Sequence, residues 1–352
     1  MYRTYSFPFF DKKYKAETVN YFLKEKVFTV SNKKGKYEII EKWREGGMGI
    51  VYKAKDPDLD RIVAIKTIKD KPMGESHFWK LRTRFGREAR IGGGILKYHP
   101  NIATIYEYDK NVPFICMEFI EGNRLDELIN KKMKEQENFS LEQTMNIMSQ
   151  LLEVLDFTHQ QKVIHRDINP NNIILTKEGT LKLIDFGIAK TEEEKEDLRR
   201  VGKWDYSSLE QLLGGKKVDH RTDIFSTGVI LYELLSGKKA FPAPFRGMSD
   251  NITERQQTYI KEIRETIKLL NPSKINQQIS YDFDWVVQKA LQTKPKERFQ
   301  TTQEFLDALL EAYLSWLCKI HYKQHHKPIF KLLKSGCGRH FTVEDLRRIL
   351  FD

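Results

Sequence analysis

Two stretches in the first third of the 352-residue chain combine residue types that suit phosphate chemistry. The glycine-rich turn 46–49 lets backbone N–H groups approach an anion closely, because glycine has no Cβ to block them. Lys66 ends the apolar run VAIK, where its ammonium group can reach a nucleotide phosphate. Glu88, in the helical segment that follows, can neutralise that lysine. The sequence therefore predicts a phosphate-binding turn with an ion pair behind it.

A third stretch adds carboxylates and amides at close spacing. Asp167 and Asn172 lie five residues apart in HRDINPNN, and Asp185 follows the strand-like run LKLI. One carboxylate can orient a hydroxyl group or accept its proton, while the amide and the second carboxylate can hold Mg²⁺. Taken in this order, these residues suit the transfer of a phosphoryl group.

The elements that must position these groups change character near residue 122. Before it, strand-like runs predominate, with one charged helical segment at 75–91. After it, apolar residues recur with a helical period, as at positions 141, 145, 148, 151, 152 and 155. Further core helices are expected at 228–235 and 283–291. We therefore predict an α+β fold in which a β-rich part precedes an α-rich part.

The net charge of +11 is concentrated at the two ends of the chain. Residues 1–36 hold nine Lys and Arg against three Asp and Glu, and residues 311–352 hold eight against four. Such ends suit an acidic protein or another anionic surface, or they are simply solvated; nucleic acid is not the expected partner. With three cysteines and no apolar run of 18 residues, we expect a cytoplasmic protein without a transmembrane helix.

From residue 37 to about 310, the ordered motifs resemble those of the eukaryotic-type protein kinase superfamily. EGGMGIVYKA, HPNI and the SLEQ segment are most similar to the bacterial Ser/Thr branch. The resemblance implies a two-lobed fold with ATP between the lobes. A β-rich N-lobe with the family's αC helix would span 37–121 and a helical C-lobe 122–312, flanked by a basic extension, 1–36, and a basic, His-rich extension, 313–352.

The resemblance also implies roles for individual residues. Lys66 would contact the α and β phosphates and pair with Glu88. Asp167 would be the catalytic base, and Asn172 and Asp185 would be the Mg²⁺ ligands. The remaining nucleotide contacts would come from Gly46, Gly47, Gly49, Val51, Ala64, Met117, Glu118, Phe119 and Ile120.

Two further pairings implied by the resemblance are structural: Glu210 with Arg298, and Asp223 with the backbone of the catalytic loop. Pro170 after HRD is typical of Ser/Thr kinases, so Ser and Thr hydroxyls of proteins are the expected substrates. Arg166 argues against the related small-molecule kinases, which usually show HGD.

Three departures from the family pattern concern packing and the nucleotide. Arg44 stands at the first glycine position of the phosphate-binding turn, and Leu209 replaces the proline of Ala-Pro-Glu. Gly92–Gly94 lengthen the segment after Glu88, and each costs about 1 kcal/mol in a helix interior. Either the helix ends near Ile91 or it is mobile there, in which case the Lys66–Glu88 pair forms only part of the time.

The fourth departure concerns catalysis directly. Asn169 occupies the position of the family lysine that contacts the transferring phosphate. Lys203 falls on a threonine position in the substrate-docking segment 202–210, so the cation could have moved from one loop to the other. The alternative is a solvated Lys203 and reduced activity, which supports a rival function as a nucleotide-binding pseudokinase that acts as a scaffold.

Two features outside these motifs also suggest function. Thr191, just after the strand that follows DFG, is the only hydroxyl side chain between residues 190 and 206. Five carboxylates follow it in residues 192–197. We hypothesise that Glu196 or Asp197 replaces a loop phosphate opposite Arg166, against the alternative of a solvated acidic loop. In the C-terminal extension, two Cys-x₂-His pairs could bind Zn²⁺, or their thiols are incidental; the four residues are Cys318, His321, Cys337 and His340.

Overall fold

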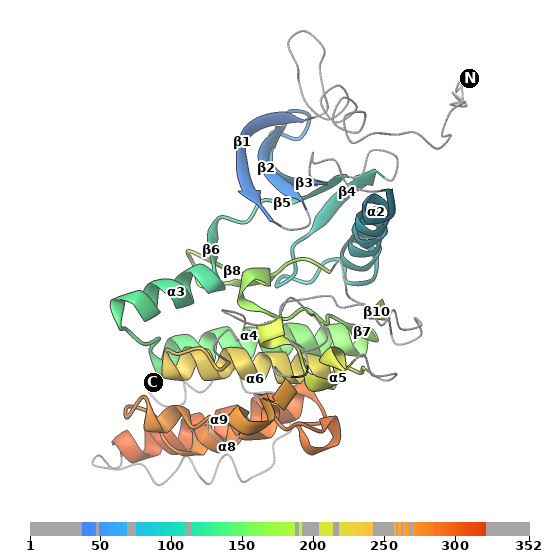
Figure 1. Ribbon diagram of the computed structural model, residues 1–352. Helices are drawn as coiled ribbons and strands as arrows, with labels where there is room; N and C mark the ends of the chain where they lie inside the picture. Colours follow the sequence, from blue (N-terminus) through green and yellow to red (C-terminus); the bar gives the residue numbers. More distant parts are fainter. Residues whose placement is uncertain are drawn as a thin grey trace, which may run out of the picture. The chain divides into compact units, whose positions relative to one another are not determined.

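The computed structural model describes residues 37–46, 49–68, 75–109, 114–186, 190–191, 204–213, 218–241, 257, 260–261, 263–267 and 270–321. These residues fall into two compact units (Figure 1). The first unit contains the described residues up to Lys97 together with 103–119, and the second contains 98–102 and everything from Ile120 onward.

The first unit is built on a five-stranded antiparallel sheet with the strand order β1-β2-β3-β5-β4. Its strands are β1 Glu38–Glu45, β2 Ile50–Asp56, β3 Arg61–Thr67, β4 Ile105–Asp109 and β5 Phe114–Glu118. Each strand falls within or next to a run that reads as a strand in the sequence. Four residues separate β1 from β2, and the four-residue turn 57–60 separates β2 from β3, so consecutive strands pair as hairpins.

One face of this sheet buries an apolar cluster. Val63 and Ile65 alternate along β3 and pack with Cys116 on β5, and Tyr37 meets Phe114 edge-on at 6.2 Å. The Tyr37 hydroxyl donates to the Glu107 carboxylate at 2.5 Å, which satisfies its polar end inside the cluster. This cluster fixes the register of β3 and β5, which carry several of the residues expected to contact the nucleotide.

Helix α2, Glu75–Arg90, packs beside β4 and β5 and ends one residue before Ile91. The chain then makes a π-helical turn, Ile91–Ile95, closed by the Leu96 N–H donating to the Ile91 carbonyl at 2.9 Å. The three glycines are thus part of a wide helical turn, and Gly92 is buried in it. This turn takes up the residues that lengthen the sequence after Glu88.

The second unit is mainly helical (Figure 1). Its helices include α3 Leu125–Glu135, α4 Leu141–Gln160, α5 Leu209–Leu212, α6 Arg221–Ser236, α8 Asp282–Ala290 and α9 Thr302–His321. Its short strands are β6 Gly122–Arg124, β7 Val163–Ile164, β8 Ile173–Thr176, β9 Leu181–Leu183 and β10 Lys190–Thr191. The 3₁₀ turns are Pro170–Asn172, Trp204–Tyr206, Pro272–Lys274 and Pro295–Glu297.

Helix α6 is the centre of this unit, since every residue after Arg221 is buried. It packs against α4 and α8, and α9 packs against both of those helices. A Cβ at Gly228 would come within 2.7 Å of the Ala290 methyl group, so the glycine allows α6 and α8 to approach closely. Because α6 is surrounded by other elements of the unit, its own polar side chains can hydrogen-bond to several of them.

The predicted apolar face of α4 is confirmed, because the six positions at helical spacing are all buried: Leu141, Met145, Met148, Leu151, Leu152 and Leu155. The helix begins with a reciprocal cap. Ser140 accepts from the Gln143 N–H at 3.0 Å, and the Gln143 side chain accepts from the Ser140 N–H at 3.1 Å.

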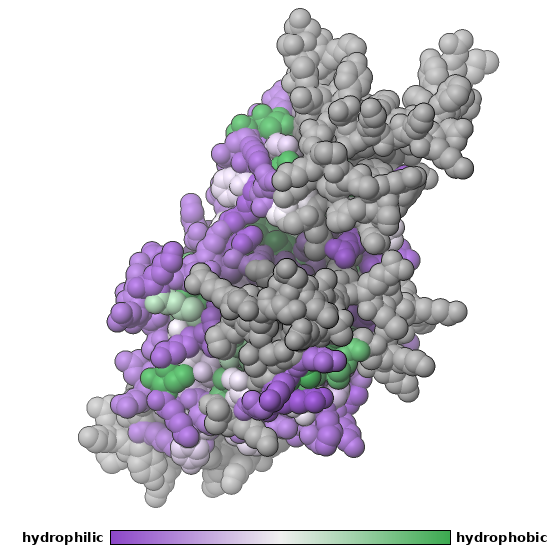
Figure 2. Space-filling model, in the orientation of Figure 1, coloured by the Kyte–Doolittle hydropathy of each residue, from purple (hydrophilic) through white to green (hydrophobic). Residues whose placement is uncertain are grey.

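The described surface in Figure 2 is mostly hydrophilic, with small, separate apolar areas. Among the described residues, no helix has both the length and the apolar character needed to cross a membrane.

Candidate active site

The glycine turn of the first unit combines a packing requirement with open space. A Cβ at Gly49 would lie 2.0 Å from the Thr67 carbonyl oxygen, so only glycine fits against β3 there. A Cβ at Gly46 would meet no described atom within 4 Å, although the Gly46 N–H donates to the Gly49 carbonyl at 2.9 Å. Packing among the described residues therefore does not require glycine at position 46. The open space beside Gly46 is what a turn that binds an anion needs.

Four residues of the expected nucleotide site lie on one face of the sheet. Val51 is directly opposite Lys66, and Ala64 is directly opposite Met117. Ala64 and Lys66 are two residues apart on β3, so their side chains point to the same side. Glu118 follows on β5, where its N–H donates to the Thr104 carbonyl at 2.8 Å. Arg44 pairs with Val51 inside β1 and is therefore a strand residue.

The ion pair between Lys66 and Glu88 is formed. The Lys66 Nζ lies 2.9 Å from Oε1 and 2.7 Å from Oε2 of Glu88. Both side chains are almost buried, at 10% and 5% exposure, and the ammonium also lies over the Phe85 ring. The sequence left open whether the helix ends near Ile91 or is mobile there. In the structure α2 ends at Arg90 and still presents Glu88 to Lys66. The result is a fixed cation on the same face as Val51.

In the second unit, Asp223 of α6 organises the loop that carries Asp167. Its two oxygens accept the backbone N–H groups of His165 at 2.9 Å and Arg166 at 2.8 Å, and His159 Nε2 lies 2.9 Å away. These bonds match the brace that the resemblance implied. Complete burial alone would raise the Asp223 pKa, but the hydrogen bonds and nearby imidazoles hold the pKa below its usual value.

Two side-chain amides hold the Asp167 carboxylate. Asn169 Nδ2 donates to Oδ1 at 2.9 Å, and Asn172 Nδ2 donates to Oδ2 at 3.0 Å. Each amide also donates to the Asp167 carbonyl at 2.9 Å. Asn169 is 2% exposed, and its Oδ1 accepts from the Asn171 N–H at 3.1 Å. Asn169 therefore orients the carboxylate as a neutral donor and brings no positive charge to it.

Asn172 and Asp185 are brought together by a backbone contact. The Ile184 N–H donates to the Asn172 carbonyl at 2.9 Å, so Asp185 comes one residue after this contact. The buried Phe186 ring lies 4.7 Å from the His165 ring, which anchors the next residue. An amide oxygen and a carboxylate are the hard oxygen ligands that Mg²⁺ prefers, so these residues fit the metal that the sequence implied.

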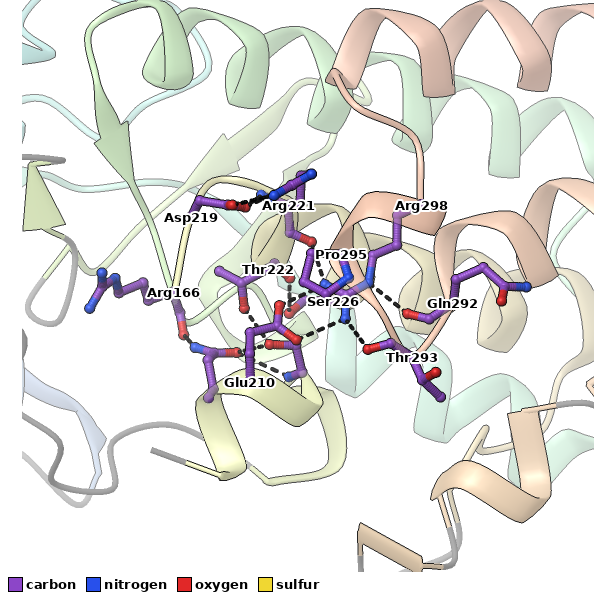
Figure 3. A network of polar contacts seen from close by, with 12 residues as sticks. Arg166, Glu210, Asp219, Arg221, Thr222, Ser226, Gln292, Thr293, Pro295 and Arg298 are labelled. Carbon is purple, nitrogen blue, oxygen red and sulfur yellow. Dashed lines mark hydrogen bonds and ion pairs between the residues drawn. The ribbon is translucent and has the colours of Figure 1, made fainter. Parts of the chain in front are cut away.

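A buried cation joins α5 to the rest of the second unit (Figure 3). Arg298 is 1% exposed, and its guanidinium donates to both oxygens of Glu210 at 2.7 and 2.8 Å. It also donates to the backbone carbonyls of Arg221, Gln292 and Thr293. The pairing matches the one that the resemblance implied. Leu209 is buried at the start of α5, so its substitution for proline is a packing feature.

Several predicted residues lie outside the described residues, and their roles stay predictions. They are Gly47, Lys203, Glu196, Asp197, Cys337 and His340. The side chains of Cys318 and His321 are not described either, and no cluster of three His, Cys, Asp or Glu residues suited to a metal occurs in the described part. Zinc binding therefore has no support.

Two polar groups of this region, on Gln211 and Lys239, were not predicted from the sequence. Gln211 donates to the Arg166 carbonyl at 2.8 Å, and Lys239 contacts both Glu233 and the Tyr206 hydroxyl. The spacing Ser208-x-x-Gln211 is the signature of a helix cap and could have singled out Gln211. Its contact with Arg166, 45 residues away, leaves no local pattern in the sequence.

Comparison with known proteins identifies the family of the chain. Residues 37–309 match the family model described as the protein kinase domain. A probable serine/threonine-protein kinase of Clostridium perfringens is 32% identical over 279 residues, which cover 78% of this chain and 38% of that protein. The serine/threonine-protein kinases PksC of Streptomyces coelicolor and PrkC of Bacillus subtilis are each 31% identical, over 80% and 77% of this chain.

The matched regions make up 50% of PksC and 39% of PrkC, so the chain spans half or less of these relatives' length. The match of the family model covers more than three quarters of the chain, from the first strand of the sheet into α9. The ordered glycine turn, ion pair, Asp167 loop and Asp185 all lie within it. On this evidence the chain belongs to the protein kinase family.

Proposed function

We propose that the chain is an ATP- and Mg²⁺-dependent protein kinase that transfers the γ-phosphoryl group to Ser and Thr hydroxyls of protein substrates. The observation that carries this proposal is the Asp167 carboxylate, which receives one amide N–H on each oxygen. A carboxylate held in this way can accept the proton of a substrate hydroxyl while that oxygen attacks the γ-phosphorus.

The residues on the sheet face of the first unit bind the nucleotide in this proposal. Lys66, fixed by Glu88, binds the α and β phosphates, and Gly46 and Gly49 cover the phosphates with backbone N–H groups. The base is bound by Val51, Ala64 and Met117 on this face. Glu118, Phe119 and Ile120, which follow Met117 in the chain, complete the base-binding residues of the proposal. The Glu88 carboxylate holds the Lys66 ammonium in place and offsets part of the cost of burying it.

Asn172 and Asp185 hold the metal, which supplies positive charge to the phosphate oxygens when it is bound. The protein's own task is to present the ligand oxygens. The amide nitrogen of Asn172 donates to Asp167, which leaves its amide oxygen to bind the metal. One side chain therefore orients the base and also supplies a metal ligand.

Asn169 leaves the site without the usual loop cation, and we propose Lys203 as its replacement. Support comes from the position of Lys203 in the family's substrate-docking pattern and from Asn169, whose amide is used in orienting Asp167. Lys203→Ala should then lower kcat by about 10²-fold, the scale of losing one electrostatic stabiliser, and adding Asn169→Lys should restore part of the rate. A Lys203→Ala variant with wild-type kcat contradicts the replacement.

The basic segments 1–36 and 313–352 are proposed to dock acidic partners, and the low cysteine content favours a cytoplasmic setting. No observation in the described residues favours the scaffold function, since the ion pair is formed and Asp167, Asn172 and Asp185 are all retained.

The deciding experiment compares the wild type with Asp167→Asn in phosphoryl transfer from radiolabelled ATP with Mg²⁺ to generic protein substrates. We expect phosphoserine and phosphothreonine from the wild type and a loss of at least about 10²-fold in the variant. Asp307→Asn, which removes an exposed carboxylate on α9, is the matched control and should retain activity. A wild type that binds ATP but transfers no phosphoryl group would instead support the scaffold function.

A further inference from the structure

The peptide group just before Asp167 is held in an unusual conformation. Arg166 has φ 66°, in the left-handed region that non-glycine residues seldom occupy. Such a conformation persists only where surrounding contacts determine it. The Arg166 N–H donates to Asp223 at 2.8 Å, and its carbonyl accepts from Gln211 Nε2 at 2.8 Å. Side chains from two different helices therefore hold the two polar groups of this one residue.

Gln211 uses the two ends of its amide for two different purposes. Its Oε1 accepts from the Ser208 N–H at 3.0 Å and the Ser208 hydroxyl at 3.3 Å, which caps the start of α5. Its Nε2 donates across to the Arg166 carbonyl. The cap fixes the orientation of the amide, and with it the direction in which the N–H group points.

Helix α5 is itself anchored firmly, so Gln211 acts from a fixed base. Ser208 shares a 2.6 Å hydrogen bond with Thr222 of α6, and Glu210 is paired with the buried Arg298. Figure 3 shows Glu210, Thr222 and Arg298 gathered in this network, with Arg166 at its edge. The cap alone does not account for a side chain that also reaches the loop before Asp167.

We propose that Gln211 is a positioning residue for phosphoryl transfer: its amide N–H holds the Arg166 carbonyl and thereby sets the orientation of the Asp167 carboxylate. This inference rests on the proposed function, because it assigns Asp167 as the base. It also connects the Asp167 loop to α5, the helix that begins at the end of the substrate-docking segment. Loss of the N–H donor should reduce the rate of transfer without changing how the first unit binds nucleotide.

Gln211→Glu separates the two purposes of the amide. The introduced carboxylate still accepts from Ser208 and still caps α5, but it cannot donate to the Arg166 carbonyl and repels that oxygen when ionised. We expect kcat to fall about ten-fold, which corresponds to about 1.4 kcal/mol, with KM for ATP and the melting temperature close to wild type. Gln211→Ala should lose both the rate and part of the stability.

A pH profile adds a readout that a purely structural role would not change. Once protonated, the introduced carboxyl group carries an O–H that can donate to the Arg166 carbonyl in place of the amide. The ratio of wild-type to Gln211→Glu kcat should therefore shrink as the pH is lowered through the pKa of that group.

Gln143→Glu is the matched control, because Gln143 caps α4 through Ser140 in the same way and has no described contact with the Asp167 loop. It should leave kcat unchanged. If Gln211→Glu also turns over like wild type, or if its rate falls only together with its melting temperature, Gln211 is a cap alone and the inference is wrong. An inactive wild type would overturn the proposed function and this inference together.

Discussion

Helix α6 buries a carboxylate near each of its ends, yet the pKa values of the two groups are shifted in opposite directions. Asp223, in the first turn, is completely buried, and its pKa is held below the ordinary value. Glu233, near the other end, is 2% exposed, and its pKa is raised. Asp223 holds the loop before Asp167, whereas Glu233 holds Tyr206, which belongs to the described part of the substrate-docking segment.

The difference lies in what surrounds each carboxylate. Burial raises both pKa values, but Asp223 receives two fixed backbone N–H groups and His159, and it lies at the positive end of the helix dipole. Glu233 lies near the negative end. Burial dominates its pKa, and the Lys239 ammonium at 3.0 Å and the Tyr206 hydroxyl at 2.9 Å offset it only in part.

This contrast shows that burial does not by itself decide the charge of a carboxylate. Backbone donors that are already fixed stabilise an anion without further loss of side-chain freedom, whereas a long lysine side chain must be ordered to do so. Lys239 is 37% exposed, so its pairing with Glu233 is also screened by solvent. The Asp223 end should therefore be the more rigid and the more sensitive to substitution.

The largest expected effect is that of Asp223→Ala. It leaves the buried N–H groups of His165 and Arg166 without their acceptor, which should destabilise the fold by about 3–5 kcal/mol and abolish phosphoryl transfer. Chemical denaturation measures the first effect. Asp219→Ala removes a half-exposed carboxylate next to α6 and should cost less than about 1 kcal/mol. Equal losses in the two variants would contradict the special role of Asp223.

A smaller effect with a characteristic pH dependence is expected for Glu233→Gln. Because the folded pKa of Glu233 is raised, its stabilising contribution is complete below the unfolded value of about 4.3 and is lost as the pH rises through the folded pKa. The advantage of the wild type over the variant should therefore decline as the pH rises above the unfolded value, as measured by thermal melting.

Asp223→Asn provides the opposite case for the same measurement. Because the pKa of Asp223 is lowered in the folded state, the stabilising contribution of its carboxylate is complete above about pH 3.9 and is lost only as the pH falls further. The stability that the Asp223→Asn variant loses should therefore be constant between about pH 5 and 8. If the stability lost in the two variants depends on pH in the same way, the pKa values at the two ends of α6 are not shifted in opposite directions.

The smallest expected effect is that of Lys239→Met. It removes a partner of Glu233 and Tyr206, and because the lysine is partly exposed, the loss of stability should stay below about 1 kcal/mol. We expect KM for the protein substrate to rise while KM for ATP stays constant, because Tyr206 lies in the substrate-docking segment 202–210. Lys238→Met, at the exposed neighbouring position, should change neither.

Much of the fold follows from local patterns in the sequence. The apolar run VAIK predicts a strand with Lys66 at its end, and β3 extends one residue further, to Thr67. The period of α4 predicts the buried face that the structure contains. The order of Asp167, Asn172 and Asp185 indicates the chemistry of the site. The π-helical turn was not predicted, because the glycines there indicate only that an ordinary helix is unfavourable.

The sequence by itself thus determined the elements and the types of group that they carry, since both depend on residue identity and on spacing within one element. Only the tertiary structure decided which groups meet. It closed the Lys66–Glu88 pair, placed Asn169 on the Asp167 carboxylate and brought Gln211 to the Arg166 carbonyl. It also set the opposite pKa shifts at the two ends of α6. These outcomes depend on burial and on the direction of donors that come from distant segments, and neither is encoded in a local pattern.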